Sequence, residues 1–318
     1  MAKYILKRIG LMLFTFLVII TICFVLVKLL PNKPPETFGQ DQALIEARRE
    51  QLGYNKPIMV QYFIFLGRSL LGGDWGISES LYVGTDVMEL FSQKLPATVM
   101  VNLYSLLLSV PLGLAFGIFA ALKKNKWQDH VISTLVMIFI SVPSYVYAFL
   151  VQYILCFKLG WFPLLVDTGT NFFLPSMVWS MFPAILSLAF GTIAGLTRFT
   201  RAELTEVLTS DFMLLARTKG LTKSQATVRH ALKNAMVPIF PMIIGEFISI
   251  LGGSIVIEQI FAVPGVGELY IKAITAATPD YNIFMLLTCF YTFVGLAAGI
   301  VIDISYGIID PRIRMGAR

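Results

Sequence analysis

Glu246 is the acidic residue that lies deepest within an apolar stretch of this sequence, VPIFPMIIGEFISILGG. A charged side chain inside a membrane-spanning helix costs at least about 2.5–3.5 kcal/mol on insertion scales. Such residues usually face a water-filled passage or a partner, so the favoured interpretation is that Glu246 faces a passage. A structural hydrogen bond within the protein is the alternative. Glu258 and Asp303 lie near the ends of apolar stretches, where nearby solvent is expected to explain them.

A second group of candidate residues is the basic segment 211–238, DFMLLARTKGLTKSQATVRHALKNAMVP. Asp211 can begin a helix, and Gly220 would end it as a left-handed residue. Thr222 then begins the next helix, and Gln225, three residues later, completes a capping box. The pattern predicts a short helix, a sharp turn and a longer helix, which could dock on a soluble partner. A basic amphipathic segment resting on anionic lipid is the alternative.

No motif in the sequence indicates catalysis or a bound cofactor. The G-x-x-x-x-G-K-[ST] phosphate-binding loop is absent, so we expect no ATP binding by this chain. The two His residues form no cluster with metal-ligand spacing. Cys23, Cys156 and Cys289 lie within apolar stretches and suggest packing rather than a disulfide or redox pair. We therefore expect neither an enzyme nor a metal site.

The composition is that of a membrane protein. Hydrophobic residues make up 57% of the 318 residues and charged residues only 14%, against about 45–50% and 25% in soluble domains. Six stretches are long enough to cross a hydrocarbon core of about 30 Å. They are residues 9–30, 96–121, 131–157, 177–197, 236–259 and 281–303. Such continuous apolar runs exclude a β-barrel and predict an all-α polytopic protein with six transmembrane helices.

The basic residues predict the orientation of these helices. Sixteen of the 25 Lys and Arg residues fall before the first span, in the second and fourth loops or after the last span. The positive-inside rule makes this side, and therefore both termini, cytoplasmic. The net charge of +6 is mostly this asymmetry, so nucleic-acid binding need not be invoked. The first apolar run is too long for a signal peptide, and we expect it to remain as a span.

The predicted spans divide the chain into three regions. Residues 1–30 form the first transmembrane helix, and residues 31–95 form an extracellular region with short helices. Residues 96–318 form a five-helix core, with a cytoplasmic coupling loop at 198–235. In the outer region PIMVQYFIFLGRSLL is amphipathic enough to lie on the membrane surface. This region is either an interfacial linker or a platform for an external partner.

The segments ARTKGL and RHALKNAMVP resemble the cytoplasmic docking loop, or EAA loop, of ABC-importer permeases. Ala216 and Gly220 keep the alanine-x3-glycine spacing of that loop. The resemblance extends along the chain through LPAT, SVPSYV, FAVPGVGELYIKAI and IIDPRIR, and is greatest to the dipeptide, oligopeptide and nickel branch. The long outer loop resembles that of the B-type permease of the pair. Leu214 and Leu215 depart from the acidic-alanine start of the general loop, and TPDYNI departs from the usual Asp-x-Pro.

The resemblance implies the type-I ABC importer permease fold and a set of partners in a bacterial cell membrane. These partners are a second, homologous permease, two ATPases that carry ATP and Mg, and an extracellular substrate-binding lipoprotein. This chain would form half of a passage for peptides. Nickel chelates, glutathione and sugars are alternative cargoes within the branch. A self-sufficient secondary transporter and a passive channel are the alternative classes; the first would need ion-coupling charges and usually inverted repeats.

The resemblance also implies two sets of site residues. Ala216 and the apolar face around it would fill a groove on an ATPase, while Arg217 and Lys219 would pair with acids at its rim. The full coupling set is Asp211, Leu215, Ala216, Arg217, Lys219, Gly220 and Leu221. Small residues four apart in the fifth span would allow close helix approach and line the passage. The pathway set is Pro143, Tyr145, Gly245, Glu246, Ser249 and Gly253.

Overall fold

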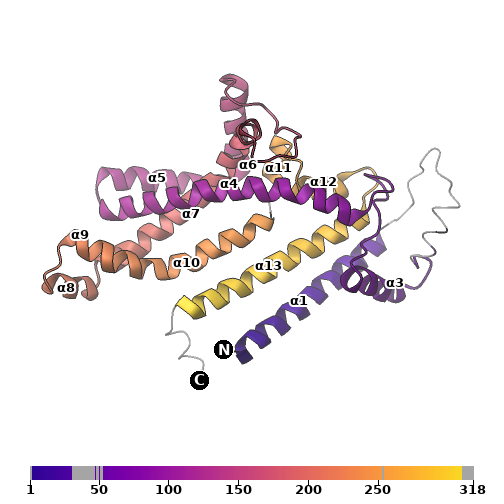
Figure 1. The fold of residues 1–318 in the computed structure, drawn as a ribbon, viewed down its shortest axis with the longest axis horizontal. Helices are drawn as coiled ribbons and strands as arrows, with labels where there is room; N and C mark the ends of the chain where they lie inside the picture. The colour runs from indigo at the N-terminus through magenta and orange to yellow at the C-terminus, as the bar shows by residue number, and fades with distance from the viewer. Residues whose placement is uncertain (1, 31–46, 48–49, 51–52, 253, 310–318) are drawn as a thin grey trace.

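A computed structural model describes residues 2–30, 47, 50, 53–252 and 254–309 (Figure 1). Every regular element within these ranges is helical, apart from one isolated antiparallel bridge between Ile77 and Asp86. The all-α prediction is confirmed. The long apolar helices are α1 (Ala2–Leu29), α4 (Val87–Leu122), α7 (Pro175–Leu208), α10 (Leu232–Ser249) and α13 (Tyr281–Ile309).

The predicted third span is broken rather than continuous. Its two halves are α5 (Trp127–Ser141) and α6 (Ser144–Val151), the latter continued by the π-helical η2 (Gln152–Lys158). They bend by 105° at the break, so that α6 runs in a different direction from α5 in Figure 1. Pro143 disfavours helical backbone at the residue before it, and Val142 is indeed extended. The described residues thus contain five apolar helices long enough to span, or six if the bent pair counts as one.

The predicted fifth span ends earlier than expected. The helix α10 gives way to a short 3-10 turn at 250–252, and a separate helix α11 (Ile255–Phe261) follows. Ser254 caps α11, since its hydroxyl accepts from the backbone N–H of Ile257. Glycine favours helix poorly, and Gly252, two residues before the capping serine, ends the short 3-10 turn and with it the span. The residues from 254 to 259 therefore belong to a different element.

Two glycines bring α4 and α7 into close contact. A Cβ atom at Gly117 would lie 2.5 Å from Cβ of Thr200, and one at Gly113 would lie 2.7 Å from Cβ of Leu196. The two glycines are one helical turn apart and face the same helix. The Thr197 hydroxyl donates to the Gly113 carbonyl oxygen at 3.2 Å across this contact. Small residues at this spacing are what allows helix backbones to approach in a membrane.

A buried ion pair joins α5 to α7 at the end of this contact. Arg201 donates from Nε and Nη2 to the two carboxylate oxygens of Asp129, at 2.5 and 2.8 Å. Asp129 is only 1% exposed. It also accepts from the backbone N–H of Asn125, a residue with φ of 62° in the turn between α4 and α5. The pair therefore fixes both the turn and the start of α5.

The first and last helices are joined by a second ion pair. Arg8 of α1 lies 2.9 Å from Asp303 of α13, and Asp303 is a third exposed. The expectation that solvent explains Asp303 is therefore incomplete. The apolar contact between the same helices includes Ile20 and Phe24 of α1 and Cys289 of α13.

The expectation that solvent explains Glu258 is wrong. Glu258 is fully buried in α11 and accepts from the Thr98 hydroxyl at 3.0 Å. Its other oxygen accepts from the backbone N–H groups of Gly267 at 2.8 Å and Glu268 at 3.3 Å. These two groups are among the unsatisfied donors at the start of α12 (Val266–Thr275). Glu258 therefore anchors the beginning of α12, where an acidic group interacts favourably with the helix dipole.

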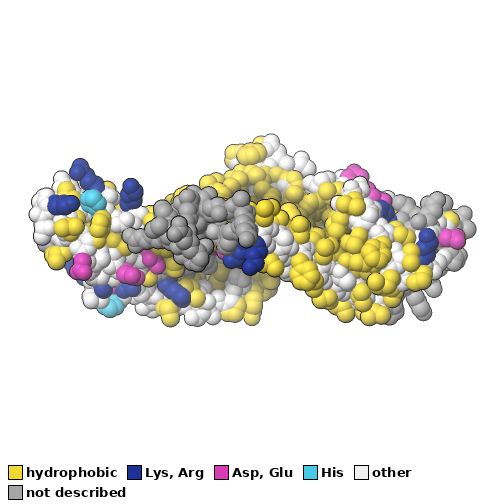
Figure 2. All heavy atoms as spheres, turned by 90° about the horizontal axis from the view of Figure 1, so that it is seen from below, with side chains coloured by type: hydrophobic (Ala, Val, Ile, Leu, Met, Phe, Trp, Pro, Cys, Tyr) yellow, Lys and Arg dark blue, Asp and Glu magenta, His cyan; other side chains and the backbone are white. Residues whose placement is uncertain are grey.

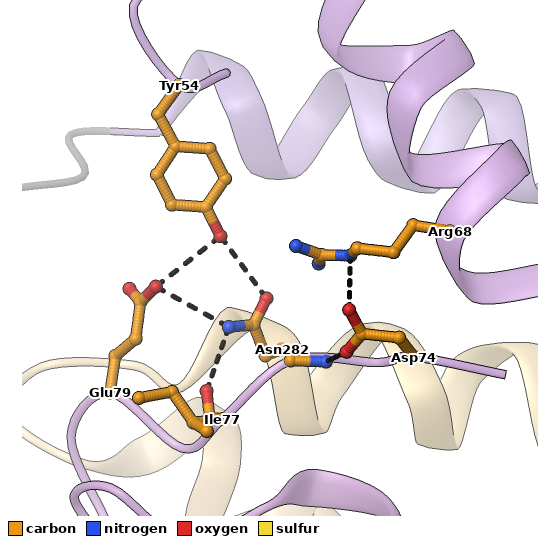
Figure 3. Close-up of polar contacts among 7 residues, drawn as sticks. Tyr54, Arg68, Asp74, Ile77, Glu79 and Asn282 are labelled. Atoms are coloured by element: carbon orange, nitrogen blue, oxygen red, sulfur yellow. Dashed lines mark hydrogen bonds and ion pairs between the residues drawn. The ribbon is translucent and has the colours of Figure 1, made fainter. Parts of the chain in front are cut away.

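The outer region is attached to the start of α13 by polar contacts. Figure 3 shows Asn282 donating to the carbonyl oxygen of Ile77 at 2.9 Å, with Tyr54 and Glu79 on its other side. Buried Asp280 accepts from the Ser78 hydroxyl at 2.6 Å. The amphipathic segment forms α3 (Ile58–Phe65), which continues as the π-helical η1 (Leu66–Leu71). The described part of this region, from residue 53 on, is thus held against the start of α13.

We predict that Gly117→Ala destabilises the protein. The added methyl would meet Cβ of Thr200 and the Thr197 carbonyl oxygen, which lies 2.9 Å from that position. Overpacking of this kind costs about 1–3 kcal/mol. Thermal unfolding in detergent measures the effect. Gly295→Ala is the matched control, because no atom lies within 4 Å of its added Cβ; equal melting temperatures for the two variants would contradict the prediction.

We also predict that removing either partner of the Asp129–Arg201 pair lowers the free energy of unfolding. Losing one member of a fully buried pair costs about 3 kcal/mol or more, because it leaves the other charge uncompensated; the loss here should be smaller, since the Arg201 side chain is 32% exposed. Asp129→Asn and Arg201→Met should each show this loss, and the double variant should lose less than the sum. Glu206→Gln, an exposed change near the same end of α7, serves as the control. Strictly additive losses would refute the coupling.

Candidate functional site

The basic segment between α7 and α10 has the local structure that the sequence predicts. It forms α8 (Asp211–Thr218), a turn at Gly220 with φ of +85°, and α9 (Lys223–Ala226), which continues through η3 (Thr227–Ala231) into α10. The backbone N–H of Gln225 donates to the Thr222 hydroxyl at 3.3 Å, and that of Thr222 donates to the Gln225 side chain at 3.1 Å. The left-handed glycine and the capping box are both confirmed.

One side of α8 packs on the protein itself. Met213 and Ala216 are buried in an apolar cluster with Ala121 of α4, Leu204 of α7 and Ala226 of α9. The expectation that Ala216 fills a groove on a partner is therefore not met in this structure. Residues three apart share one helix face, and Met213 directs that face toward the ends of α4 and α7. The small side chain of Ala216 lets α8 lie close to them.

The remaining surface of α8 is apolar and exposed. Phe212, Leu214 and Leu215 are 47%, 62% and 53% exposed, respectively. The Phe212 ring meets the His230 ring of η3 edge-on, with centroids 5.8 Å apart, and so ties α8 to the helix that enters the bundle. Exposed apolar side chains on a segment outside the long spans indicate an interaction surface. We call these three residues the α8 face.

The remaining predicted coupling residues surround the α8 face. Asp211 and Lys219 are exposed, and Leu221 is half-buried against the same cluster as Ala216. Arg217 belongs to α8, but its side chain lies outside the described part of the structure. Figure 2 shows charged side chains of both signs gathered at the end of the molecule that carries α8 and α9.

A groove beside α8 includes residues that sequence reasoning had used only for orientation. It has a volume of about 520 Å³ and lies between the α4–α5 turn, the end of α7 and α8. Lys124 and Lys126 line one side, while Ser210 and Asp211 line the other. Only the spatial approach of α4 to α7 brings this turn to α8. The KKNK run of the α4–α5 turn is a visible basic motif, but it lies far from α8 along the chain, so the sequence does not show that the two line one groove.

A small polar cavity lies within the bundle between α4, α7 and α10. It has a volume of about 60 Å³, and both Glu246 and Ser249 line it. Thr192 of α7 lines the same cavity. The other polar lining residues are Asn102, Ser105 and Ser109 of α4. Sequence reasoning missed these three, although their spacing of three and four places them on one face of an apolar helix.

The structure does not bring the other predicted pathway residues to this cavity. Gly245 faces α13, and a Cβ atom there would lie 2.9 Å from Cδ1 of Ile302. Pro143 and Tyr145 are exposed at the α5–α6 bend. Gly253 lies outside the described residues. No group of three or more His, Cys, Asp or Glu side chains that could hold a metal occurs in the described ranges.

Comparisons with known proteins agree with this architecture. Residues 113–315 match the family described as "Binding-protein-dependent transport system inner membrane component". Residues 1–102 match the corresponding N-terminal family of the membrane component.

Curated relatives match along nearly their whole length. The dipeptide transport system permease protein DppB of Lactococcus lactis is 34% identical over 99% of this chain and 100% of its own. The oligopeptide transport system permease protein AppB of Bacillus subtilis is 33% identical over 98% of this chain and 99% of its own. The glutathione transport system permease protein GsiC of Salmonella choleraesuis is 32% identical over 99% of each chain. The chain therefore belongs to the family of binding-protein-dependent transport system inner membrane components, as a multi-pass membrane permease.

Proposed function

We propose that this chain forms half of the passage of an ATP-driven peptide importer in the bacterial cell membrane, with both termini in the cytoplasm. The α8 face is the observation that carries the proposal, because it is exposed and apolar and contacts η3, which runs directly into α10. The importer would comprise a second permease, two ATPases that bind ATP and Mg, and an extracellular binding lipoprotein. Hydrolysis of ATP belongs to those partners, and membrane lipids surround the assembly.

The proposed coupling proceeds through short, fixed contacts. An ATPase that moves the α8 face would push on η3 through the Phe212–His230 contact and on α9 through the turn at Gly220. Buried Met213 and Ala216 would transmit the same push to the ends of α4 and α7. Because α9, η3 and α10 follow one another without a loop, the displacement reaches the segment that carries Glu246.

Peptides are the cargo that the relatives support best. Dipeptides, oligopeptides and glutathione appear in the names of relatives that are 32–34% identical to this chain. The test is reconstitution of the purified assembly in proteoliposomes with labelled alanyl-alanine and ATP. ATP-dependent accumulation supports the proposal. Accumulation by this chain alone, without ATP, would instead indicate a secondary transporter, and passive equilibration would indicate a channel.

We predict that Leu215→Asp reduces recovery of the ATPase subunits with this chain by at least tenfold. Leu215 is 53% exposed, so the change should spare the fold while placing a charge in the proposed contact. The measurement is quantitative co-purification in mild detergent. Val83→Asp is the matched control, since Val83 is 40% exposed but lies in the outer region. Equal recovery with both variants would remove the α8 face from the interface.

We predict that Gly220→Val leaves the subunit inserted and assembled but separates ATP hydrolysis from peptide uptake. No described atom beyond the adjacent residues lies within 4 Å of an added Cβ, so the penalty arises from the backbone at φ of +85°. It amounts to about 1–2 kcal/mol for a residue with a Cβ. Asparagine tolerates this region better, so Gly220→Asn should retain more uptake per ATP hydrolysed than Gly220→Val. Normal uptake in the valine variant would disprove the coupling role of the turn.

A further inference from the structure

We propose that Glu246 binds the positively charged amino terminus of the transported peptide within the polar cavity between α4, α7 and α10. This inference rests on the proposed function and adds a chemical specificity to the passage. The cavity would hold the ammonium group while the rest of the peptide extends out of it. Glu246 would thus select for cargo with a free amine.

The cavity offers a carboxylate surrounded by neutral polar groups. Thr192 of α7 lines the cavity together with Glu246, and Ser105, Ser109 and Asn102 approach from α4. The side chains of Asn102 and Ser109 donate to backbone carbonyl oxygens of their own helix, at 2.7 and 3.4 Å. A hydroxyl that donates in this way keeps its lone pairs available to accept. The lining is therefore rich in acceptors, which is the arrangement that an ammonium donor requires.

Glu246 differs in its surroundings from the two acids described above that form ion pairs. Asp129 is compensated by Arg201, and Asp303 by Arg8. The residues that line the Glu246 cavity include no Lys, Arg or His. A partly buried carboxylate without a cation either takes up a proton or binds a cation, because either removes the cost of burying the bare charge. An ammonium group that enters the cavity would supply the cation, whereas the carboxylate end of a peptide would be repelled.

The size of the cavity fits one end group. Its volume of about 60 Å³ is room for a few water molecules, and an ammonium group is about the size of one. Ser249 lines it and is exposed, so the cavity is open on that side. In this conformation it does not enclose a whole peptide. Recognition of a single shared group would tolerate different side chains, and the cargoes named for the relatives all carry a primary amine.

The first experiment measures ATP-driven uptake of labelled alanyl-alanine by the complete reconstituted transporter. We expect Glu246→Gln to reduce the uptake rate at least tenfold, and Glu246→Asp to retain more than Glu246→Gln. Glu89→Gln is the matched control, because Glu89 is an exposed acid at the outer end of α4. Unchanged uptake with Glu246→Gln would overturn the inference. Failure of the unsubstituted transporter to import any peptide would instead refute the proposed function.

A second experiment needs no variant and therefore does not depend on assembly of a mutant. The rate at which a hydrophobic carbodiimide modifies Glu246 is measured by mass spectrometry on the transporter without its binding protein. We expect saturating alanyl-alanine to slow the modification at least fivefold and N-acetyl-alanyl-alanine to leave it unchanged. Equal protection by both peptides, or protection by sodium chloride alone at matched concentration, would overturn recognition of the amino terminus.

Discussion

The close contact between α4 and α7 is the constraint on which the rest of the structure depends. Gly113 and Gly117 allow the two backbones to approach, and the contact continues along two of the longest helices in the described chain. At one end it brings the α4–α5 turn to the end of α7 and so creates the seat for α8. Farther along, the same two helices supply most of the polar lining around Glu246. The Glu246 cavity and the α8 face therefore both depend on the contact between α4 and α7.

The features that could be predicted from the sequence are those fixed by neighbouring residues. Gly220 is left-handed and Thr222 and Gln225 form a capping box, because each depends on backbone geometry within a few positions. The apolar helices follow for a similar reason, since their length alone meets the thickness of a bilayer. The break at Pro143 was also a local signal, but continuous hydrophobicity across it favoured a single helix.

The features that could not be predicted depend on residues distant along the chain. Ala216 faces the core because Ala121 and Leu204 happen to lie there, and no pattern within α8 reveals this. Glu258 looked like an acid at a span end, but the start of α12 and Thr98 enclose it. The polar face of α4 can be recognised as part of a cavity only once Glu246 is known to lie across from Asn102, Ser105 and Ser109. Each requires the tertiary arrangement, which periodicity does not contain.

The ion pair between Arg8 and Asp303 constrains the order in which the helix bundle can assemble during biogenesis. Arg8 lies in α1 and Asp303 in α13, so the other long helices of the described chain are synthesised between the two partners. The contact can form only after α13 has been made. Until then, the charge of Arg8 favours keeping the start of α1 near lipid headgroups and water. Closure of the bundle by this bridge would therefore be a late event in biogenesis, and a chain truncated before α13 could not achieve it.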